Sequence, residues 1–149
     1  MKRSFFFLFV LLAAVFASCS SLFAQGAIRP VELSGTLQAN DDDSTGAIRL
    51  NLGEGPINFY GQRFSSVYVN NNGNITFGDS LSDYTPRGLQ TGVGLPIIAP
   101  FFADVDTYGE GSGLVHYGNA TINGRQAFVA SYIGVGYFDS NRTSSTAFR

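Results

Sequence analysis

The stretch VYVNNNGNITFG, residues 67–78, constrains the fold most, because two short strand-forming runs flank a cluster of asparagines and one glycine. A two-residue turn at Asn72-Gly73 would mix polar and apolar side chains on both faces of a hairpin. A loop over residues 71–73, with glycine in the left-handed conformation, pairs Val69 with Ile75 and leaves one face wholly apolar. We therefore predict a hairpin with this longer loop.

The same register defines a polar face for the hairpin. Asn70 and Asn74 lie on it, where we expect them to meet water or a partner. Asn74 also begins the glycosylation sequon NIT, and further sequons begin at Asn119 and Asn141. In a eukaryotic protein we expect Asn74 to be modified, whereas in a bacterial protein the three sequons are chance features of an asparagine-rich chain.

Residues 1–24 have the pattern of a secretory signal peptide. Lys2 and Arg3 precede an apolar run that is shorter than the roughly 20 residues of a membrane-spanning helix. We place cleavage after Ala24. A lipid anchor at Cys19 is the alternative, because the tetrapeptide FASC is similar to a bacterial lipoprotein signal. The chain is thus expected to be secreted, with residues 25–149 as its domain and no membrane insertion after the signal is removed.

Charge and cysteine content narrow the classes of partner. Removing the leader leaves seven arginines and no lysine against eleven acidic residues, a formal charge of −4. Such a domain lacks the basic surface that binding to nucleic acid or to an anionic membrane requires. No cysteine remains after residue 24, so the extracellular domain depends on its core and not on disulfides.

The rest of the chain alternates apolar and polar residues with a period of two, and no window favours a helix. Together with eighteen glycines, this pattern predicts an all-β fold, an antiparallel β-sandwich-like domain with long surface loops. The expected strands lie within residues 47–52, 57–60, 64–70, 74–78, 96–103, 113–118 and 125–138, with a turn over 119–124. The long loops are residues 79–94 and 103–113.

The second long loop carries Asp104, Asp106 and Glu110, three carboxylates that calcium could use. Their spacing matches only the start of an EF-hand loop. Aspartates that follow a buried strand commonly accept hydrogen bonds from loop amides and so stabilise the turn. We therefore expect a structural role for this loop and predict no metal site.

The residues needed for catalysis are mostly missing from the sequence. His116 is the only histidine, and no serine stands in a nucleophile-elbow context. The chain has too few ligands for zinc, and the absence of tryptophan weakens a glycosidase interpretation. We predict no catalytic residues, no cofactor and no enzymatic activity, with a hydrolase as the disfavoured alternative.

Two motifs in sequence order resemble the nidogen-like extracellular (NIDO) domain, known from nidogen, alpha-tectorin and a large membrane mucin. They are INFYGQRFSSVYVNNNGNITFG and PIIAPFFADVDTYGEGSGLVHY, and the likeness extends over residues 54–138. Phe102 stands where the family usually has tryptophan. Because the family domain continues beyond a strand like that ending at Phe138, the resemblance implies that this chain is a fragment.

The resemblance implies a non-enzymatic module of matrix and cell-surface proteins, associated with cell–matrix adhesion. We therefore expect an extracellular protein or glycan partner. The alternative is a carbohydrate-binding module of a secreted protein, in which Tyr68, Tyr84 or Tyr108 would provide the platforms on which sugar rings stack.

Overall fold

The computed structural model describes residues 31–86 and 93–139, and within them every regular element is a β-strand. The strands are β1 Gly35–Thr36, β2 Ile48–Arg49, β3 Ile57–Phe59, β4 Gln62–Phe64, β5 Ser66–Asn70, β6 Asn74–Thr76, β7 Ile97–Ile98, β8 His116–Ile122 and β9 Arg125–Ser131. All strand pairs are antiparallel, which confirms the all-β prediction. The sandwich arrangement stays a prediction. The expected leader, with Cys19, and the sequon at Asn141 lie outside the described residues.

The hairpin of β5 and β6 has the predicted register. Val69 pairs with Ile75, Asn70 pairs with Asn74, and residues 71–73 form the loop. Gly73 has a φ of 78°, the left-handed conformation that the loop requires. Two local properties therefore predict this hairpin correctly. Glycine tolerates a positive φ, and all apolar side chains must lie on one face.

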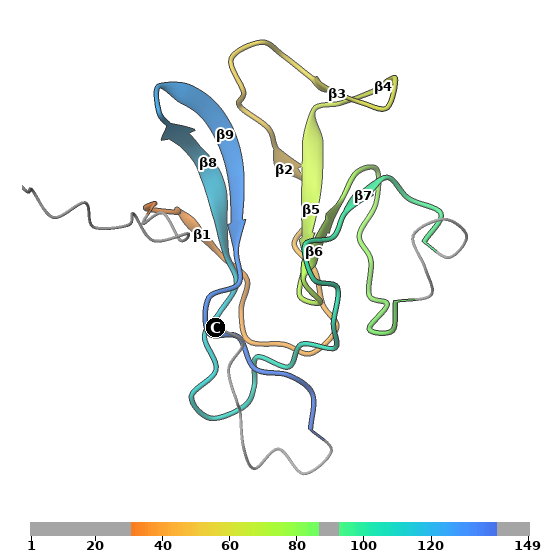
Figure 1. Ribbon diagram of the computed structural model, residues 1–149, viewed down its shortest axis with the longest axis vertical. Helices are drawn as coiled ribbons and strands as arrows, with labels where there is room; N and C mark the ends of the chain where they lie inside the picture. Colours follow the sequence, from red (N-terminus) through yellow and green to blue (C-terminus); the bar gives the residue numbers. More distant parts are fainter. Residues whose placement is uncertain (1–30, 87–92, 140–149) are drawn as a thin grey trace, which may run out of the picture. The chain divides into compact units, whose positions relative to one another are not determined.

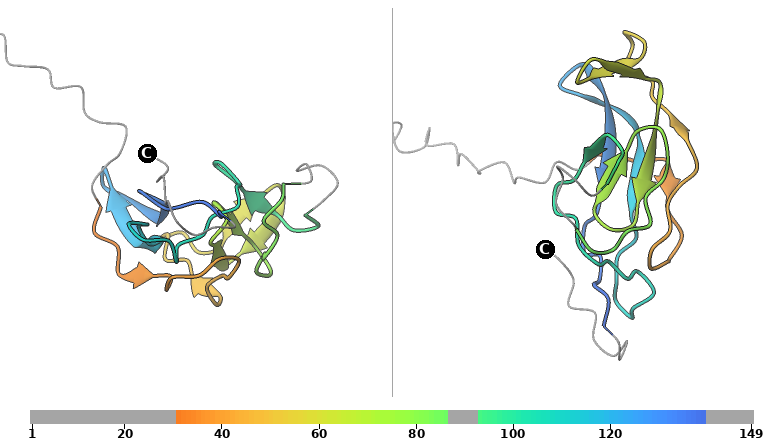
Figure 2. Two further views of the ribbon diagram at one scale, coloured as in Figure 1. Left: turned by 90° about the horizontal axis from the view of Figure 1, so that it is seen from below. Right: turned by 90° about the vertical axis from the view of Figure 1, so that its right-hand side faces the viewer.

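The described residues form three sheets. Their strand orders are β1-β8-β9, β2-β5-β6-β7 and β3-β4. The first two place elements far apart in sequence beside one another, since β1 pairs with β8 and β2 pairs with β5. In Figures 1 and 2 the long β8–β9 hairpin lies beside the β5–β6 hairpin, and the β3–β4 ribbon lies near their shared end.

Two tight turns differ from the sequence-based expectation. The structure extends β8 to Ile122, so the turn predicted over residues 119–124 shortens to Asn123-Gly124, where both φ angles are positive. Tyr60-Gly61 forms a similar turn between β3 and β4, and the sequence reading had missed this pairing. Two-residue turns with positive φ match the twist of paired strands, which explains why the ladders continue so close to the turns.

The apolar run at residues 96–103 forms a much shorter strand than predicted. Only Ile97–Ile98 pairs with β6. Pro96 and Pro100 lack an amide hydrogen and cannot donate to a ladder, so the pairing is confined between them. Likewise, the run at residues 125–138 leaves strand geometry after Ser131. The segments beyond these strands become loops that cover the hairpin.

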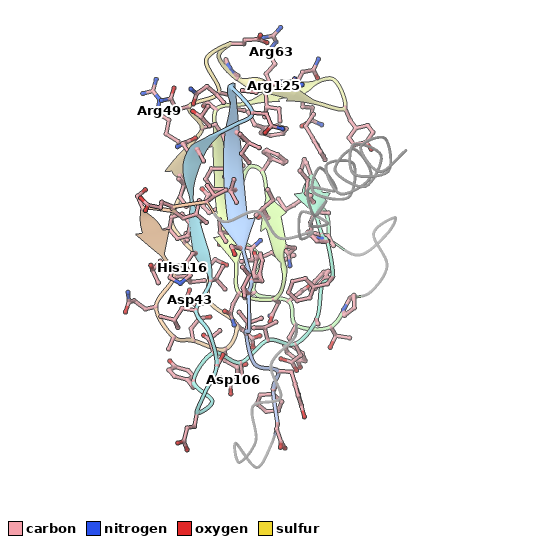
Figure 3. The ribbon with its side chains drawn as sticks, turned by 60° about the vertical axis from the view of Figure 1, so that its left-hand side comes forward. Asp43, Arg49, Arg63, Asp106, His116 and Arg125 are labelled. Carbon is pink, nitrogen blue, oxygen red and sulfur yellow. The ribbon has the colours of Figure 1, made fainter. Side chains whose placement is uncertain are left out.

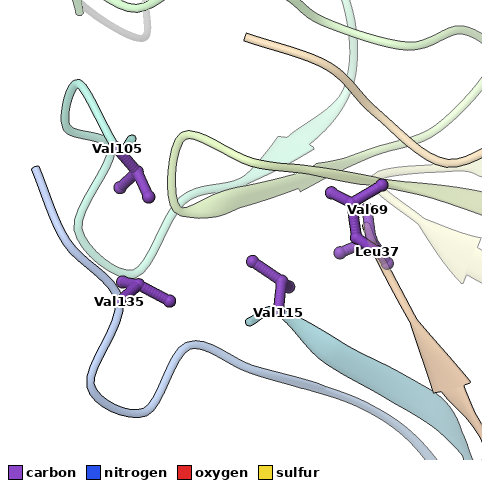
Figure 4. Close-up of a cluster of buried hydrophobic side chains, with 5 residues drawn as sticks. All are labelled: Leu37, Val69, Val105, Val115 and Val135. Carbon is purple, nitrogen blue, oxygen red and sulfur yellow. The ribbon is translucent and has the colours of Figure 1, made fainter. Parts of the chain in front are cut away.

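In the part of the chain that the structure describes, two apolar clusters form the core. The first contains five buried aliphatic side chains from separate segments, drawn together in Figure 4: Leu37, Val69, Val105, Val115 and Val135. The second joins Leu50, Val67 and Phe77. Ile48 and Phe128 pack against both clusters, so the apolar contacts form a continuous core. Between residues 31 and 139, leaving aside 87–92, no helix is long and apolar enough to cross a membrane.

Candidate functional site at the asparagine hairpin

The polar face of the hairpin is buried, contrary to our expectation that it meets water or a partner. Asn70, Asn74 and Thr76 each have an exposed fraction of 0%. Loop segments cover this face, and their main-chain groups supply the hydrogen bonds that water would otherwise make. We call Asn70, Asn71, Asn72 and Asn74 the asparagine hub.

Asn70 connects the two hairpin strands to the loops above them. Its amide nitrogen donates to Asn74 Oδ1 at 2.7 Å and to Thr76 Oγ1 at 3.0 Å. Its Oδ1 accepts hydrogen bonds from Ser44 Oγ at 2.8 Å and from the main-chain nitrogen of Leu81 at 3.0 Å. Both ends of one amide are therefore saturated, which removes the cost of burying it.

Asn71 and Asn72 hold the segment 40–43 against the segment 103–107. Asn72 donates to Asp42 Oδ1 at 2.8 Å, and its own Oδ1 accepts from the main-chain nitrogen of Val105 at 2.8 Å. The Asn71 amide nitrogen contacts main-chain oxygens on both segments. The side chains of the loop asparagines thus join two segments by hydrogen bonds, as main-chain groups do between paired strands elsewhere in the fold.

An acidic cluster lies beside the hub. Asp41, Asp42 and Asp104 are all half-buried, and one carboxylate oxygen from each lies within 4.8 Å of the others. Burial, together with the neighbouring charges of Asp42 and Asp106, raises the pKa of Asp104 above its ordinary value. The sequence reading missed Asp41 and Asp42, although three consecutive aspartates after Asn40 were a visible signal.

The structure separates the carboxylates that the sequence reading had grouped. Asp106 is 3% exposed, and its Oδ1 accepts a hydrogen bond from the main-chain nitrogen of Tyr108 at 2.8 Å, the structural role that we expected. Glu110 is exposed. Only Asp104 of the original three belongs to the acidic cluster, because its partners come from a distant part of the sequence.

The described arginines lie away from Asp43 and Asp106. Figure 3 shows Arg49, Arg63 and Arg125 at one end of the molecule and Asp106 toward the other, with Asp43 also on that side. His116 is exposed on β8 and bonds Thr36 Oγ1 through Nδ1 at 3.1 Å, so it is an ordinary surface histidine. Within residues 31–86 and 93–139, His116 bonds neither a serine nor a carboxylate.

The tyrosines proposed as sugar platforms differ in exposure. Tyr84 is 53% exposed and Tyr108 is 57% exposed, but Tyr68 is half-buried. Tyr108 belongs to the loop at residues 103–113. Main-chain hydrogen bonds join this loop to residues 134–138, from Gly113 N to Gly134 O at 2.7 Å and from Phe138 N to Asp104 O at 3.0 Å.

Comparison with known proteins places these features in a family. The family model described as NIDO related matches residues 21–149. Nidogen-2 of Mus musculus is 34% identical over 122 residues, which cover 75% of this chain and 8% of that protein. Alpha-tectorin of Mus musculus is 42% identical over 65 residues, covering 44% of this chain and 3% of that protein. Nidogen of Drosophila melanogaster is 29% identical over 118 residues, covering 64% of this chain and 9% of that protein.

The chain therefore spans less than a tenth of the length of these curated relatives. No solved structure matches it.

Proposed function

We propose that this chain, which belongs to the NIDO related family, is a secreted, non-enzymatic module that binds an extracellular matrix partner. Its kinship with nidogens and alpha-tectorin supports an extracellular, matrix-associated role. Adhesion between cells and matrix is the specific form of this role that we propose. The leader at residues 1–24 and the domain at 25–149 are part of the same proposal.

The observation that carries the proposal is a group of exposed apolar side chains on two adjoining loops. Tyr108 is 57% exposed, Ile133 is 58% exposed and Tyr137 is 38% exposed. The hydrogen bonds between residues 104–113 and 134–138 hold their loops together. We call these three side chains the loop surface. Exposed aromatic and aliphatic groups on a rigid scaffold are typical of protein–protein contact sites.

Binding of the purified chain to an array of isolated extracellular matrix proteins tests the proposal. We expect saturable binding to at least one of them, and a Tyr108→Ser/Tyr137→Ser variant should weaken it by about tenfold or more, as removal of buried interface aromatics does. Tyr60→Ser is the matched control, because Tyr60 is 94% exposed at the turn between β3 and β4. If the parent and the double variant bind the matrix protein with equal affinity, the loop surface does not form the binding site.

A glycan array run in parallel separates the alternative carbohydrate-binding function. Binding to a defined saccharide that is lost in Tyr84→Ala, with no binding to matrix proteins, would favour that alternative. N-terminal sequencing of the secreted chain tests the domain boundary, and we expect it to begin at residue 25.

A further inference from the structure

The acidic cluster brings together three carboxylates from two separate segments of the chain. Asp41 and Asp42 come from the segment after β1, and Asp104 comes from the segment after β7. Neither Asp42 nor Asp104 forms an ion pair with an arginine or histidine among the residues that the structure describes. The arginines labelled in Figure 3 stand away from Asp43 and Asp106, the labelled aspartates of the same two segments. Ionised carboxylates this close repel one another, and a cation bound between them would offset that repulsion.

A second observation involves Asn71, which is 1% exposed. Its side chain reaches into the junction between the two acidic segments, where the amide nitrogen contacts the main-chain oxygens of Asn40, Asp41 and Val105. An amide nitrogen carries only two hydrogens, so it cannot satisfy three carbonyl oxygens in full. Asn71 Oδ1 is itself buried and accepts no hydrogen bond from the described part of the chain.

Asn72 orients the cluster from outside. It donates to Asp42 Oδ1 and accepts from the main-chain nitrogen of Val105, both at 2.8 Å. The Asn72 side chain thereby holds one carboxylate oxygen of Asp42 in place. It also joins Asp42 to Val105, the residue next to Asp104. Outer hydrogen bonds of this kind commonly position the carboxylates that bind a metal.

We propose that Asp41, Asp42 and Asp104, with the neighbouring carbonyl oxygens and Asn71 Oδ1, form a calcium site that joins the two loop segments. Calcium takes six to eight oxygen ligands with flexible geometry, and this junction combines carboxylate, amide and main-chain oxygens. Softer transition metals prefer histidine or cysteine, and the cluster contains neither.

This inference does not depend on the proposed matrix function. It also differs from the calcium ligands considered in the sequence, because Asp106 and Glu110 are not members of the cluster. Only Asp104 is common to both sets.

Calcium titration of the full chain tests the site. We expect isothermal titration calorimetry with CaCl2 to show one ion per chain, with a dissociation constant on the order of 0.1 to 1 mM, as in other extracellular modules. The melting temperature should be at least about 5 °C higher in saturating calcium than in chelator. Magnesium should bind more weakly, because it demands stricter octahedral geometry.

Two single-charge variants locate the ion. Asp42→Asn keeps an oxygen that can accept from Asn72, so the fold is retained while a charged ligand is lost, and calcium affinity should fall by about tenfold or more. Asp43→Asn is the matched control. Asp43 is the next residue, is exposed, contributes no oxygen to the cluster and accepts from the main-chain nitrogen of Ser44 through an oxygen that asparagine also has. The calcium affinity of the Asp43→Asn variant should stay within about twofold of that of the parent chain.

The possible results are distinguishable. A parent chain that binds no calcium at about 10 mM, well above the usual range for extracellular modules, would overturn the proposal. Equal losses in Asp42→Asn and Asp43→Asn would also overturn it, because they would indicate diffuse attraction to an acidic surface. Equal affinity for magnesium would reject calcium as the preferred ion.

Discussion

The amide nitrogen of Asn70 donates to Asn74 Oδ1 across the base of the hairpin loop, at 2.7 Å and with both side chains fully buried. Truncating Asn74 to alanine leaves the Asn70 amide with one acceptor fewer in a site that water does not reach. We expect Asn74→Ala to lower the free energy of unfolding by about 1 to 3 kcal/mol. Urea denaturation measures the change. Asn51→Ala is the control, because Asn51 is exposed, and it should alter stability by less than about 0.5 kcal/mol.

The burial of Asn74 also predicts its modification state. A glycan on its amide nitrogen cannot be accommodated in a side chain with an exposed fraction of 0%. Folded chain secreted from eukaryotic cells should therefore carry no glycan at Asn74, contrary to the expectation from sequence. Mass spectrometry of the peptide that contains residues 74–76 provides the measurement. Glycosylated Asn74 in material that melts cooperatively would contradict the buried position.

Gly73 lies beneath the ring of Phe101, and a Cβ atom there would come within 2.6 Å of that ring. Gly73→Ala should thus cost about 2 kcal/mol or more, from the left-handed φ and from the steric clash together. Asparagine adopts a left-handed φ more readily than most residues that carry a Cβ. We now expect Gly73→Asn to be destabilising as well, since it has the same Cβ.

A double-mutant cycle separates the two costs at Gly73. In a Phe101→Ala background the clash disappears but the backbone strain remains, so Gly73→Ala should cost only about 1 kcal/mol. Chemical denaturation of the four chains measures this coupling. Strictly additive effects would show that Phe101 does not restrict the position.

Asp106 stabilises its loop through a hydrogen bond with the main-chain nitrogen of Tyr108. Removing the carboxylate in Asp106→Ala leaves that amide without its partner, and the chain should lose about 1 to 3 kcal/mol of stability. Because Asp106 is not a member of the acidic cluster, the decrease in melting temperature should be similar in calcium and in chelator. A decrease seen only in calcium would make Asp106 a ligand.

Tyr132 bridges the hairpin from outside, with its hydroxyl 2.9 Å from the main-chain oxygens of both Asn70 and Asn74. Burial raises its pKa, so the folded state holds the proton more tightly than the unfolded state, whose tyrosines titrate near about 10. The resulting stability is complete below about pH 10 and is lost as the pH rises toward the folded-state pKa.

Tyr132→Phe isolates this contribution. At about pH 8 the variant should be less stable than the parent by about 1 kcal/mol, the usual value of one hydrogen bond. Between about pH 10 and 11 the difference should shrink, because only the parent must keep a buried phenol protonated. Urea midpoints at the two pH values measure it, and a constant difference would show that the Tyr132 hydroxyl is equally solvated in both states.

Local patterns predicted the elements whose contacts are close in sequence. The pairing of Val69 with Ile75 follows from strand alternation and from a glycine at the left-handed loop position, and both are properties of a dozen consecutive residues. The structural role of Asp106 is local in the same way, because its partner Tyr108 is two residues away. The same reasoning failed at Asn123-Gly124, where we assigned a longer turn to residues that continue the ladder.

The sequence by itself thus determined the strand-forming segments, the register of the central hairpin and the likeness to nidogen-like domains. Only the tertiary structure decided the surroundings of the asparagines, because alternation separates the two faces of a hairpin but does not say whether loops will cover the polar one. It also brought Asp104 to Asp41 and Asp42, which lie more than sixty positions earlier in the chain. Contacts over such distances depend on how the whole chain closes around its core, and no short stretch of sequence contains that information.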